Sequence, residues 1–206
     1  RRNRLSFSVM TFHPVLAEPE QIPDAVAVLS VAFAHDPVLS FLFPDPVTRP
    51  GLLATFFAAR LAAGVGMDFL YLSEGKGSAA LWLSPLVEGD LKPSWDAVLA
   101  ATIALMGEEE TMKRFAALEP MIEAKPKEPH WYLEFVGTRS ESRGKGLGSA
   151  LIKVITDRCD VEGMPAALES SDPVNVPLYE RHGFRVTQVV EIIGGPPVPM
   201  MWRDPA

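Results

Sequence analysis

The segment that most constrains the fold and function runs from Arg143 to Ala150 and reads RGKGLGSA. An aromatic-rich segment typical of a β-strand, residues 131–136, precedes it, and an apolar pattern of helical period follows it. Three glycines in five positions let backbone N–H groups turn outward together. The start of the helix adds unpaired N–H donors and the positive end of a dipole. This order of elements predicts a binding site for a phosphate or pyrophosphate group.

Two familiar phosphate-binding loops do not match this segment. A P-loop needs Ser or Thr directly after its lysine, whereas Lys145 is followed by Gly146, and no glycine stands five positions before Gly144. The dinucleotide fingerprint needs the spacing G-x-G-x-x-G, but the glycines here read G-x-G-x-G. The pattern that does fit is R-x-x-G-x-G, formed by Arg143, Gly146 and Gly148.

This loop resembles the pyrophosphate loop of the GNAT superfamily of N-acetyltransferases. A second segment supports the resemblance, because residues 178–184, LYERHGF, match the family's L-Y-E-x-x-G-F motif at the expected distance from the loop. The two motifs occur in the family's order and lie within residues 131–184, roughly a quarter of the chain. A purely structural alternative, a tight turn between a strand and a helix, explains the glycines but not the second motif.

The resemblance implies acetyl-CoA as the cosubstrate, with its pyrophosphate at the glycine loop. Main-chain groups at the end of the preceding strand are expected to contact the pantetheine arm and the thioester. The implied cofactor-binding residues are Val136, Gly137, Thr138, Arg143, Gly144, Lys145, Gly146, Leu147, Gly148, Ser149 and Asn175.

The chain departs from the family pattern in two places. Residues 137–140, GTRS, stand where many members have Val-Asp-Pro after the fourth strand. Many members also place a cofactor-contacting asparagine seven residues before the tyrosine, where this chain has Asp172. Asn175 is the nearby candidate for that contact, so the cofactor contacts of this segment stay open.

Acetyl transfer to an amine requires a proton acceptor for the ammonium group and a proton donor for the departing thiolate. Tyr179 occupies the position that the resemblance assigns to the donor, and a phenol stays protonated at neutral pH. Glu134 interrupts an apolar strand, where a carboxylate is costly unless it faces a cleft or a partner. It is therefore either the base or part of a structural ion pair. Glu169 on a neighbouring strand and a chain of water molecules are the alternatives for the base.

Composition narrows the class of protein and of partner. A formal charge of −7 without a visible basic stripe argues against a nucleic-acid partner. Apolar runs are too short for a membrane span, and the single cysteine, Cys159, falls on an apolar helix face that predicts core packing. The four histidines lack ligand spacing, so no metal site is expected. We expect a cytoplasmic protein, monomeric or homodimeric, without membrane or nucleic-acid partners.

The hydrophobic pattern predicts one α/β domain over residues 10–206, with residues 1–9 an upstream extension ahead of Met10. Its predicted fold is the GNAT-like acyl-CoA N-acyltransferase fold, a central, mixed, mostly antiparallel twisted sheet flanked by helices. Predicted helices lie at about 25–34, 37–43, 49–63, 94–106 and 108–119, with a possible further turn at 121–124, then after Gly146 and from residue 175 to a cap at Gly183. Predicted strands lie at about 12–16, 68–73, 78–83, 131–136, 166–171 and 184–193, with a last strand ending near residue 202.

Residues 84–129 form a predicted helical insertion between the third and fourth strands, where the family usually has a short turn. One interpretation is additional core, with Leu105, Met112, Phe115 and Leu118 packing on the sheet. The other is a wall or lid over the acceptor pocket. The two interpretations are compatible.

The favoured function is transfer of acetyl from acetyl-CoA to a primary amine of a small molecule, by direct attack in a ternary complex. One alternative is a non-catalytic acyl-CoA-binding regulatory module of the same fold. Another is a protein or peptide N-terminal acetyltransferase, which would need a groove as wide as a peptide.

Overall fold

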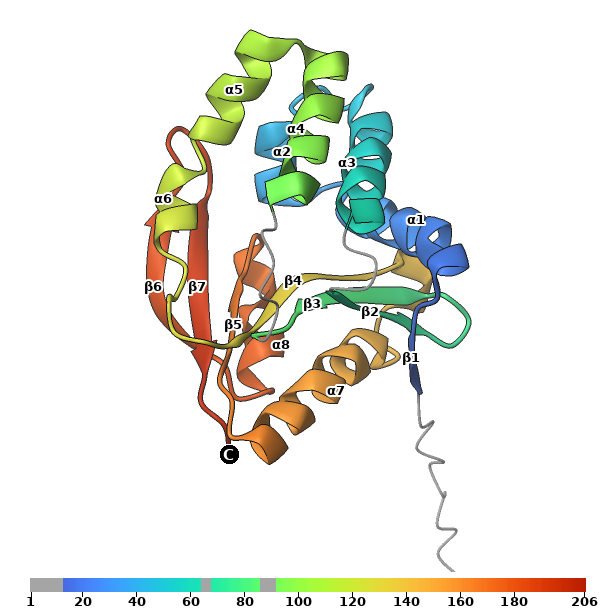
Figure 1. Ribbon diagram of the computed structural model, residues 1–206, viewed down its shortest axis with the longest axis vertical. Coiled ribbons are helices and arrows are strands. Elements are labelled where there is room, and N and C mark those ends of the chain that lie inside the picture. Colours follow the sequence, from blue (N-terminus) through green and yellow to red (C-terminus); the bar gives the residue numbers. More distant parts are fainter. Residues whose placement is uncertain (1–12, 64–67, 86–91) are drawn as a thin grey trace, which may run out of the picture.

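The computed structural model describes residues 13–63, 68–85 and 92–206. These residues form one seven-stranded sheet in the order β1-β2-β3-β4-β5-β7-β6. All neighbouring strands are antiparallel except β4 and β5, which are parallel. Figure 1 shows a strong twist, with β2 to β4 nearly perpendicular in the view to β6 and β7. The strands are β1 (Pro14–Leu16), β2 (Asp68–Ser73), β3 (Ser78–Leu83), β4 (Trp131–Thr138), β5 (Ala166–Glu169), β6 (Arg185–Glu191) and β7 (Pro197–Arg203).

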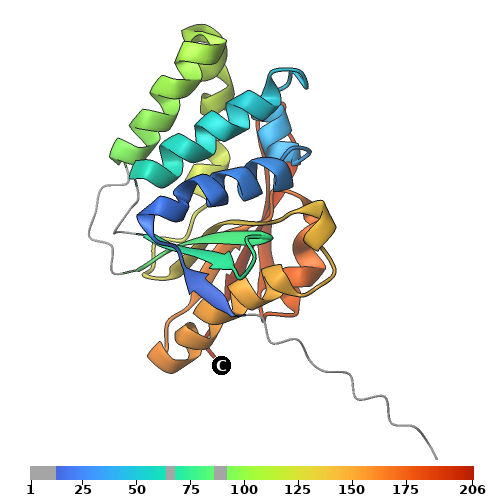
Figure 2. The ribbon, with the colours of Figure 1, turned by 90° about the vertical axis from the view of Figure 1, so that its right-hand side faces the viewer.

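Helices α1 (Ile22–Ala32), α2 (Pro37–Leu42) and α3 (Arg49–Ala63) cover one face of the sheet. Figure 2 shows α1, α3 and the later helix α4 (Lys92–Met106) side by side above the strands. Phe33, Phe56 and Phe57 pack with Phe135 of β4 at ring-centroid distances of 5.2 to 6.0 Å. This aromatic cluster joins the helical layer to the central strand.

The other face of the sheet is covered by α7 (Leu147–Glu162) and α8 (Val176–Glu180). The apolar side of α7 contributes Leu151, Ile152 and Ile155 to a core that contains Trp82 and Trp131. Cys159 is buried in this core, as its sequence position predicted.

Helices α4, α5 (Glu108–Ala116) and α6 (Glu119–Glu123) lie between β3 and β4, as predicted for the insertion. They form an arch, because α5 contacts α2 and the end of the insertion reaches the β6–β7 hairpin. Arg114 donates to the carbonyl oxygen of Phe41 at 2.5 Å, and the N–H of Ile193 donates to the carbonyl of Ala117 at 3.3 Å. The arch therefore connects α2 to the β6–β7 hairpin.

The sequence-predicted elements are present, with shifted ends. The helix expected over 108–119 ends at Ala116, and the further turn expected over 121–124 is the short helix α6, which begins earlier, at Glu119, with Pro120 in its first turn. The expected packing of the insertion on the sheet is wrong for Leu105 and Met112, whose side chains are 58% and 47% exposed. The predicted extension at 1–9 and residue Phe12 lie outside the described residues.

Candidate functional site

The two parallel strands separate where the site begins. β4 pairs with β5 only over Trp131 to Leu133, so residues 134–138 of β4 have no partner on β5. The register with β3 also shifts at this point, and Glu134 has no opposite residue. This β-bulge places Glu134 and Phe135 on the helical face of the sheet. The separated strand leaves main-chain groups free to bind an extended ligand.

The glycine loop lies between the end of β4 and the start of α7. Gly146 is the N-cap of α7 in the left-handed conformation (φ 82°), and Gly144 also has positive φ (73°). Among the described residues, no backbone carbonyl accepts a hydrogen bond from the N–H groups of residues 144–149. These donors lie at the positive end of a 16-residue helix. The loop therefore has the unpaired donors that the predicted pyrophosphate site requires.

Side chains around this loop add polar groups to it. Arg143 Nε donates to the carbonyl of Thr138 at 3.3 Å, and Lys145 Nζ donates to the carbonyl of Glu141 at 2.9 Å. Ser149 Oγ lies 2.7 Å from Nε2 of His182 in the turn after α8. Partial burial lowers the pKa of His182, so at neutral pH this pair is an uncharged hydrogen bond. His182 was not predicted as a site residue, and no sequence spacing marks it.

The residues expected along the pantetheine arm differ in burial and in how closely neighbouring atoms approach them. A Cβ atom on Gly137 would lie 2.7 Å from Cβ of Ala32, so glycine is required there by the packing of α1. A Cβ atom on Gly148 would lie 3.2 Å from Oγ1 of Thr138, and Leu147 is buried. Val136 is partly buried beside the core under α7. Asn175 is exposed just before α8.

Tyr179 projects from α8 and is 7% exposed. Among the described residues its hydroxyl makes no hydrogen bond. Burial raises its pKa well above the usual range, and the negative charges of Asp36, Glu169 and Asp172 raise it further, in that order. The phenol is therefore protonated, and the charges of three carboxylates act on it.

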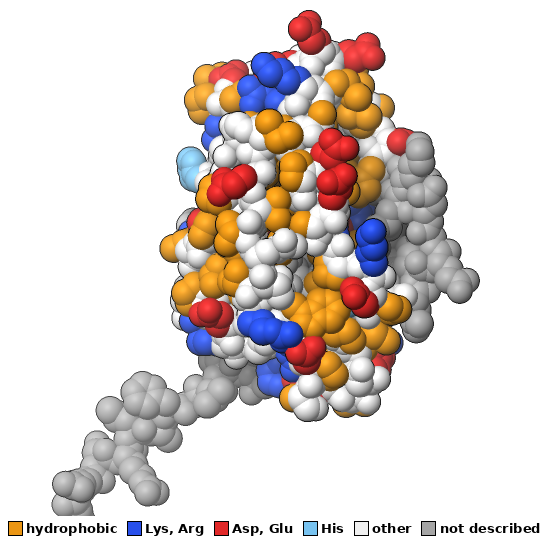
Figure 3. All heavy atoms as spheres, turned by 90° about the vertical axis from the view of Figure 1, so that its left-hand side faces the viewer, with side chains coloured by type: hydrophobic (Ala, Val, Ile, Leu, Met, Phe, Trp, Pro, Cys, Tyr) orange, Lys and Arg blue, Asp and Glu red, His pale blue; other side chains and the backbone are white. Residues whose placement is uncertain are grey.

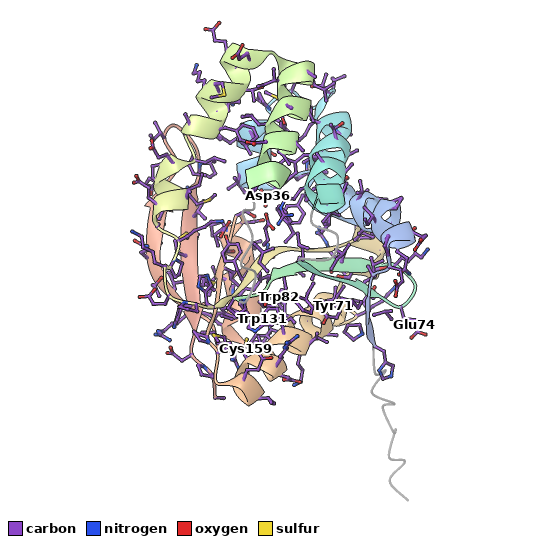
Figure 4. The ribbon with its side chains drawn as sticks, viewed as in Figure 1. Asp36, Tyr71, Glu74, Trp82, Trp131 and Cys159 are labelled. Carbon is purple, nitrogen blue, oxygen red and sulfur yellow. The ribbon has the colours of Figure 1, made fainter. Side chains whose placement is uncertain are left out.

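Asp36 was predicted only as a helix cap, and the structure brings it to this site. It is the N-cap of α2, and its Oδ1 accepts the N–H of Leu39 at 2.9 Å. Its Oδ2 accepts a hydrogen bond from Ser171 Oγ, which follows β5. Figure 4 shows Asp36 between the helices and the sheet. The sequence signal was present, since Asp before Pro starts a helix, but nothing in the sequence linked it to Tyr179.

Glu134 forms a buried ion pair with Arg60 of α3. The guanidinium donates from Nε to Oε1 at 2.9 Å and from the second nitrogen to Oε2 at 2.5 Å. The Arg60 side chain is fully buried and that of Glu134 is 6% exposed. Both carboxylate oxygens are thus engaged, and the adjacent cation favours the ionised form.

Glu169 lies at the end of β5 on the same face of the sheet. Its Oε1 is 3.6 Å from Nζ of Lys125, which also stands 4.3 Å over the ring of Tyr132. The second oxygen, Oε2, is buried without a hydrogen-bond partner, as is the hydroxyl of Tyr132. The described residues therefore leave two buried polar atoms unsatisfied here, the hydroxyl of Tyr132 and Oε2 of Glu169.

Two further features concern the class of site. Among the described residues, no three or more His, Cys, Asp or Glu side chains are arranged to hold a metal ion. No helix in the described part of the chain is long and apolar enough to cross a membrane. Figure 3 shows one face of the molecule on which Lys and Arg side chains are scattered among Asp and Glu.

The sheet with one separated parallel pair and the glycine loop at a helix start are features of the GNAT acyltransferase fold. The family model for Acetyltransferase (GNAT) matches residues 94–184. An N-acetyltransferase of Schizosaccharomyces pombe, itself uncharacterised, is 28% identical over 91% of this chain and 81% of that protein.

Solved structures agree in fold. A Corynebacterium glutamicum structure, described as histone acetyltransferase HPA2 and related acetyltransferase, has a TM-score of 0.72 and 25% identity, covering 96% of this chain and 98% of that one. Arylalkylamine N-acetyltransferase 2 of Aedes aegypti has a TM-score of 0.59, 12% identity and coverage of 94% and 99%. The NatC complex bound to Gag peptide and CoA has a TM-score of 0.51, 11% identity and coverage of 96% and 100%.

The family model, the relative and the Corynebacterium structure together support a GNAT superfamily acetyltransferase. The family uses acyl-CoA donors and amine acceptors.

Proposed function

We propose that this protein transfers acetyl from acetyl-CoA to a primary amine of a small cationic molecule. The donor pyrophosphate binds the free N–H groups of residues 144–149, and the pantetheine arm follows the unpaired edge of β4 from Thr138 to Val136. Tyr179 protonates the departing thiolate. The observation that carries the proposal is the buried side chain of Tyr179, whose hydroxyl has no hydrogen-bond partner among the described residues and on which three carboxylates act electrostatically.

The carboxylates support a cationic acceptor. Asp36, Glu169 and Asp172 all act electrostatically on Tyr179, and among the described residues only Glu169 has a cationic partner, Lys125. An alkylammonium group would offset this negative charge, whereas a neutral acceptor would not.

The insertion supports a small acceptor over a peptide. An extended peptide needs an open channel across the sheet. The arch instead joins α2 to the β6–β7 hairpin over the face that α1, α2 and α3 cover. At Gly195 in that hairpin a Cβ atom would already lie 3.3 Å from the Phe41 ring of α2. A closed compartment suits a compact molecule and excludes water. The arylalkylamine enzyme among the structural neighbours is consistent with such an acceptor, and the NatC neighbour keeps the peptide alternative open.

Direct attack of the amine is favoured over a covalent acetyl-enzyme. The only cysteine, Cys159, is fully buried in the core beneath α7, and burial raises its pKa to about 12. A thiol that is protonated and enclosed is a poor nucleophile. The amine and the donor must then be bound together when acetyl is transferred.

Replacing Gly146 with valine tests the donor site. A β-branched residue with positive φ costs about 1–3 kcal/mol of local strain, and its side chain would occupy the front of the helix start. We expect acetyl-CoA affinity to fall by at least about tenfold, which is a binding loss of about 1.4 kcal/mol, and thiol release to fall with it. Calorimetry with acetyl-CoA provides the measurement.

The matched control is Gly163→Val at the other end of α7. Gly163 also has positive φ (64°). A Cβ atom added at either glycine would have no other atom of the described residues within 4 Å. The two variants should therefore lose similar stability, while only the first loses affinity. Equal affinities for the two variants would contradict the proposed donor site.

A further inference from the structure

The base in this reaction must take a proton from an ammonium group. A free alkylamine has a pKa of about 10.4 and is almost entirely cationic at neutral pH. Glu134, the predicted base, has both oxygens bound by the buried Arg60 guanidinium. A carboxylate stabilised in this way is a weak proton acceptor. Another carboxylate on the same face is better suited.

Asp36 is more available to accept a proton than Glu169 or Asp172. Glu169 is paired with Lys125, and Asp172 caps the next turn by accepting the N–H of Val174 at 3.1 Å. Asp36 accepts one hydrogen bond on each oxygen, from Leu39 and Ser171, and both donors are neutral. Each oxygen therefore keeps a lone pair for a further donor.

The position of Asp36 is fixed by the fold. Pro37 starts α2 directly after it, with Asp36 in the extended conformation that an N-cap needs. Arg49 holds the same α1–α2 connection by donating to the carbonyl oxygens of Ala34, Phe43 and Pro44 at 3.3, 2.6 and 2.9 Å. The carboxylate is thus preorganised at 9% exposure, where water competes little for its lone pairs.

A second observation is that polar groups of this region lack hydrogen-bond partners among the described residues. The Tyr179 side chain is more than nine-tenths buried without a hydrogen-bond partner among the described residues, and the charge of Asp36 is the strongest that acts on it. Glu169 Oε2 on the same face is buried and unpartnered as well. An amine bound between Asp36 and Tyr179 would satisfy donors and acceptors that the protein leaves open.

We propose that Asp36 binds the acceptor's ammonium group and takes its proton, acting as the catalytic base opposite Tyr179. This inference rests on the proposed function and names a residue that the sequence marked only as a helix cap.

The proton transfers balance as follows. The ammonium gives one proton to Asp36, and the neutral nitrogen attacks the thioester carbon. When the C–S bond breaks, Tyr179 gives its proton to the sulfur, and the phenolate takes the second proton lost by the new amide nitrogen. Asp36 then releases its proton to solvent. The net reaction yields an N-acetyl product, free CoA thiol and one proton.

Asp36→Asn is the informative variant because Asn caps a helix as well as Asp does. Burial raises the pKa of Asp36, so its ionised form is disfavoured in the folded protein and costs stability at neutral pH. The melting temperature of the variant should therefore be unchanged or higher, and its acetyl-CoA affinity unchanged. Asp45→Asn is the control, since Asp45 is an exposed carboxylate that bonds only to Val47 and Thr48 among the described residues.

Activity should separate the two variants. With the best amine acceptor at neutral pH, we expect Asp36→Asn to lose about 10²–10⁴-fold in kcat/KM, and Asp45→Asn to match the wild type. The remaining activity needs free amine, so it should rise about tenfold per pH unit toward pH 10 and narrow the gap to the wild type. The other titratable groups that interact with Asp36 are the carboxylate of Asp172, from the segment after β5, and the neutral phenol of Tyr179, from α8.

Each outcome decides a different question. Wild-type kcat/KM in Asp36→Asn at neutral pH would overturn the role of Asp36 alone, as would a loss that is equal at every pH. A wild-type protein that binds acetyl-CoA but acetylates no amine would overturn the proposed function and the base together. Calorimetric titration of the acceptor into the CoA-bound protein supplies an independent readout, and Asp36→Asn should weaken that binding.

Discussion

Tyr179→Phe is expected to lower turnover by about 10²–10⁴-fold, the usual effect of losing a general acid. The variant keeps the ring and its packing against Phe184, at a centroid distance of 6.5 Å. The hydroxyl has no hydrogen-bond partner among the described residues, so its removal should not destabilise the fold. A CoA thiol has a pKa of about 8.5, so some thiolate can leave unaided and the loss should be incomplete.

The pH profile gives this prediction a second test. Burial and nearby carboxylates raise the pKa of Tyr179 far above neutrality, so the phenol stays protonated in alkaline solution. Wild-type kcat should therefore show no loss between pH 8 and about pH 10 from ionisation of a phenol. Tyr71→Phe, a change at a half-buried tyrosine on β2, is the control and should keep full turnover. Full turnover in Tyr179→Phe would refute the acid role.

Glu134→Gln is expected to destabilise the protein by about 3–5 kcal/mol, the usual cost of breaking a buried ion pair. The guanidinium of Arg60 would lose the carboxylate that neutralises it, and both side chains are almost fully buried. Glu110→Gln is the control. Glu110 pairs with Arg114 at 2.5 Å along one turn of α5, with side chains 43% and 22% exposed, and such pairs contribute only about 0.3–0.5 kcal/mol. Urea unfolding of the three proteins provides the comparison.

A double replacement separates structure from catalysis at this pair. Changing both Arg60 and Glu134 to methionine removes the two charges together, which is often neutral or stabilising when the volume is kept. We expect most of the lost stability to return. A Glu134→Gln protein with normal stability but little turnover would instead indicate that Glu134 is the base.

The sequence predicted the local structure around the glycine loop well, because its features depend on neighbouring residues. The order of strand, glycine loop and helix follows from spacing alone, and Gly146 has the positive φ that such a turn needs. The cap at Asp36 was also predicted, since it depends on neighbouring residues. Boundaries in the insertion were less accurate, because Leu118 and Pro120 allow either one bent helix or two.

The acceptor side could not be predicted in the same way, because it depends on contacts between distant residues. Arg60 and Glu134 are 74 positions apart, and Asp36 and Ser171 are 135 positions apart. Periodicity placed each residue in its element but could not show which partner it meets. The exposure of Leu105 has the same origin, since an apolar residue in a helical pattern says nothing about which face finds a neighbour.

Acetylation of small amines is the central claim, and an acceptor panel tests it most directly. Release of CoA thiol from acetyl-CoA would be measured with polyamines, aralkylamines, aminoglycosides, nucleoside antibiotics and short peptides, with products identified by mass spectrometry. We expect turnover with at least one small cationic amine and little with peptides of any N-terminal residue. Turnover with peptides alone, or tight acetyl-CoA binding without transfer to any amine, would contradict the account.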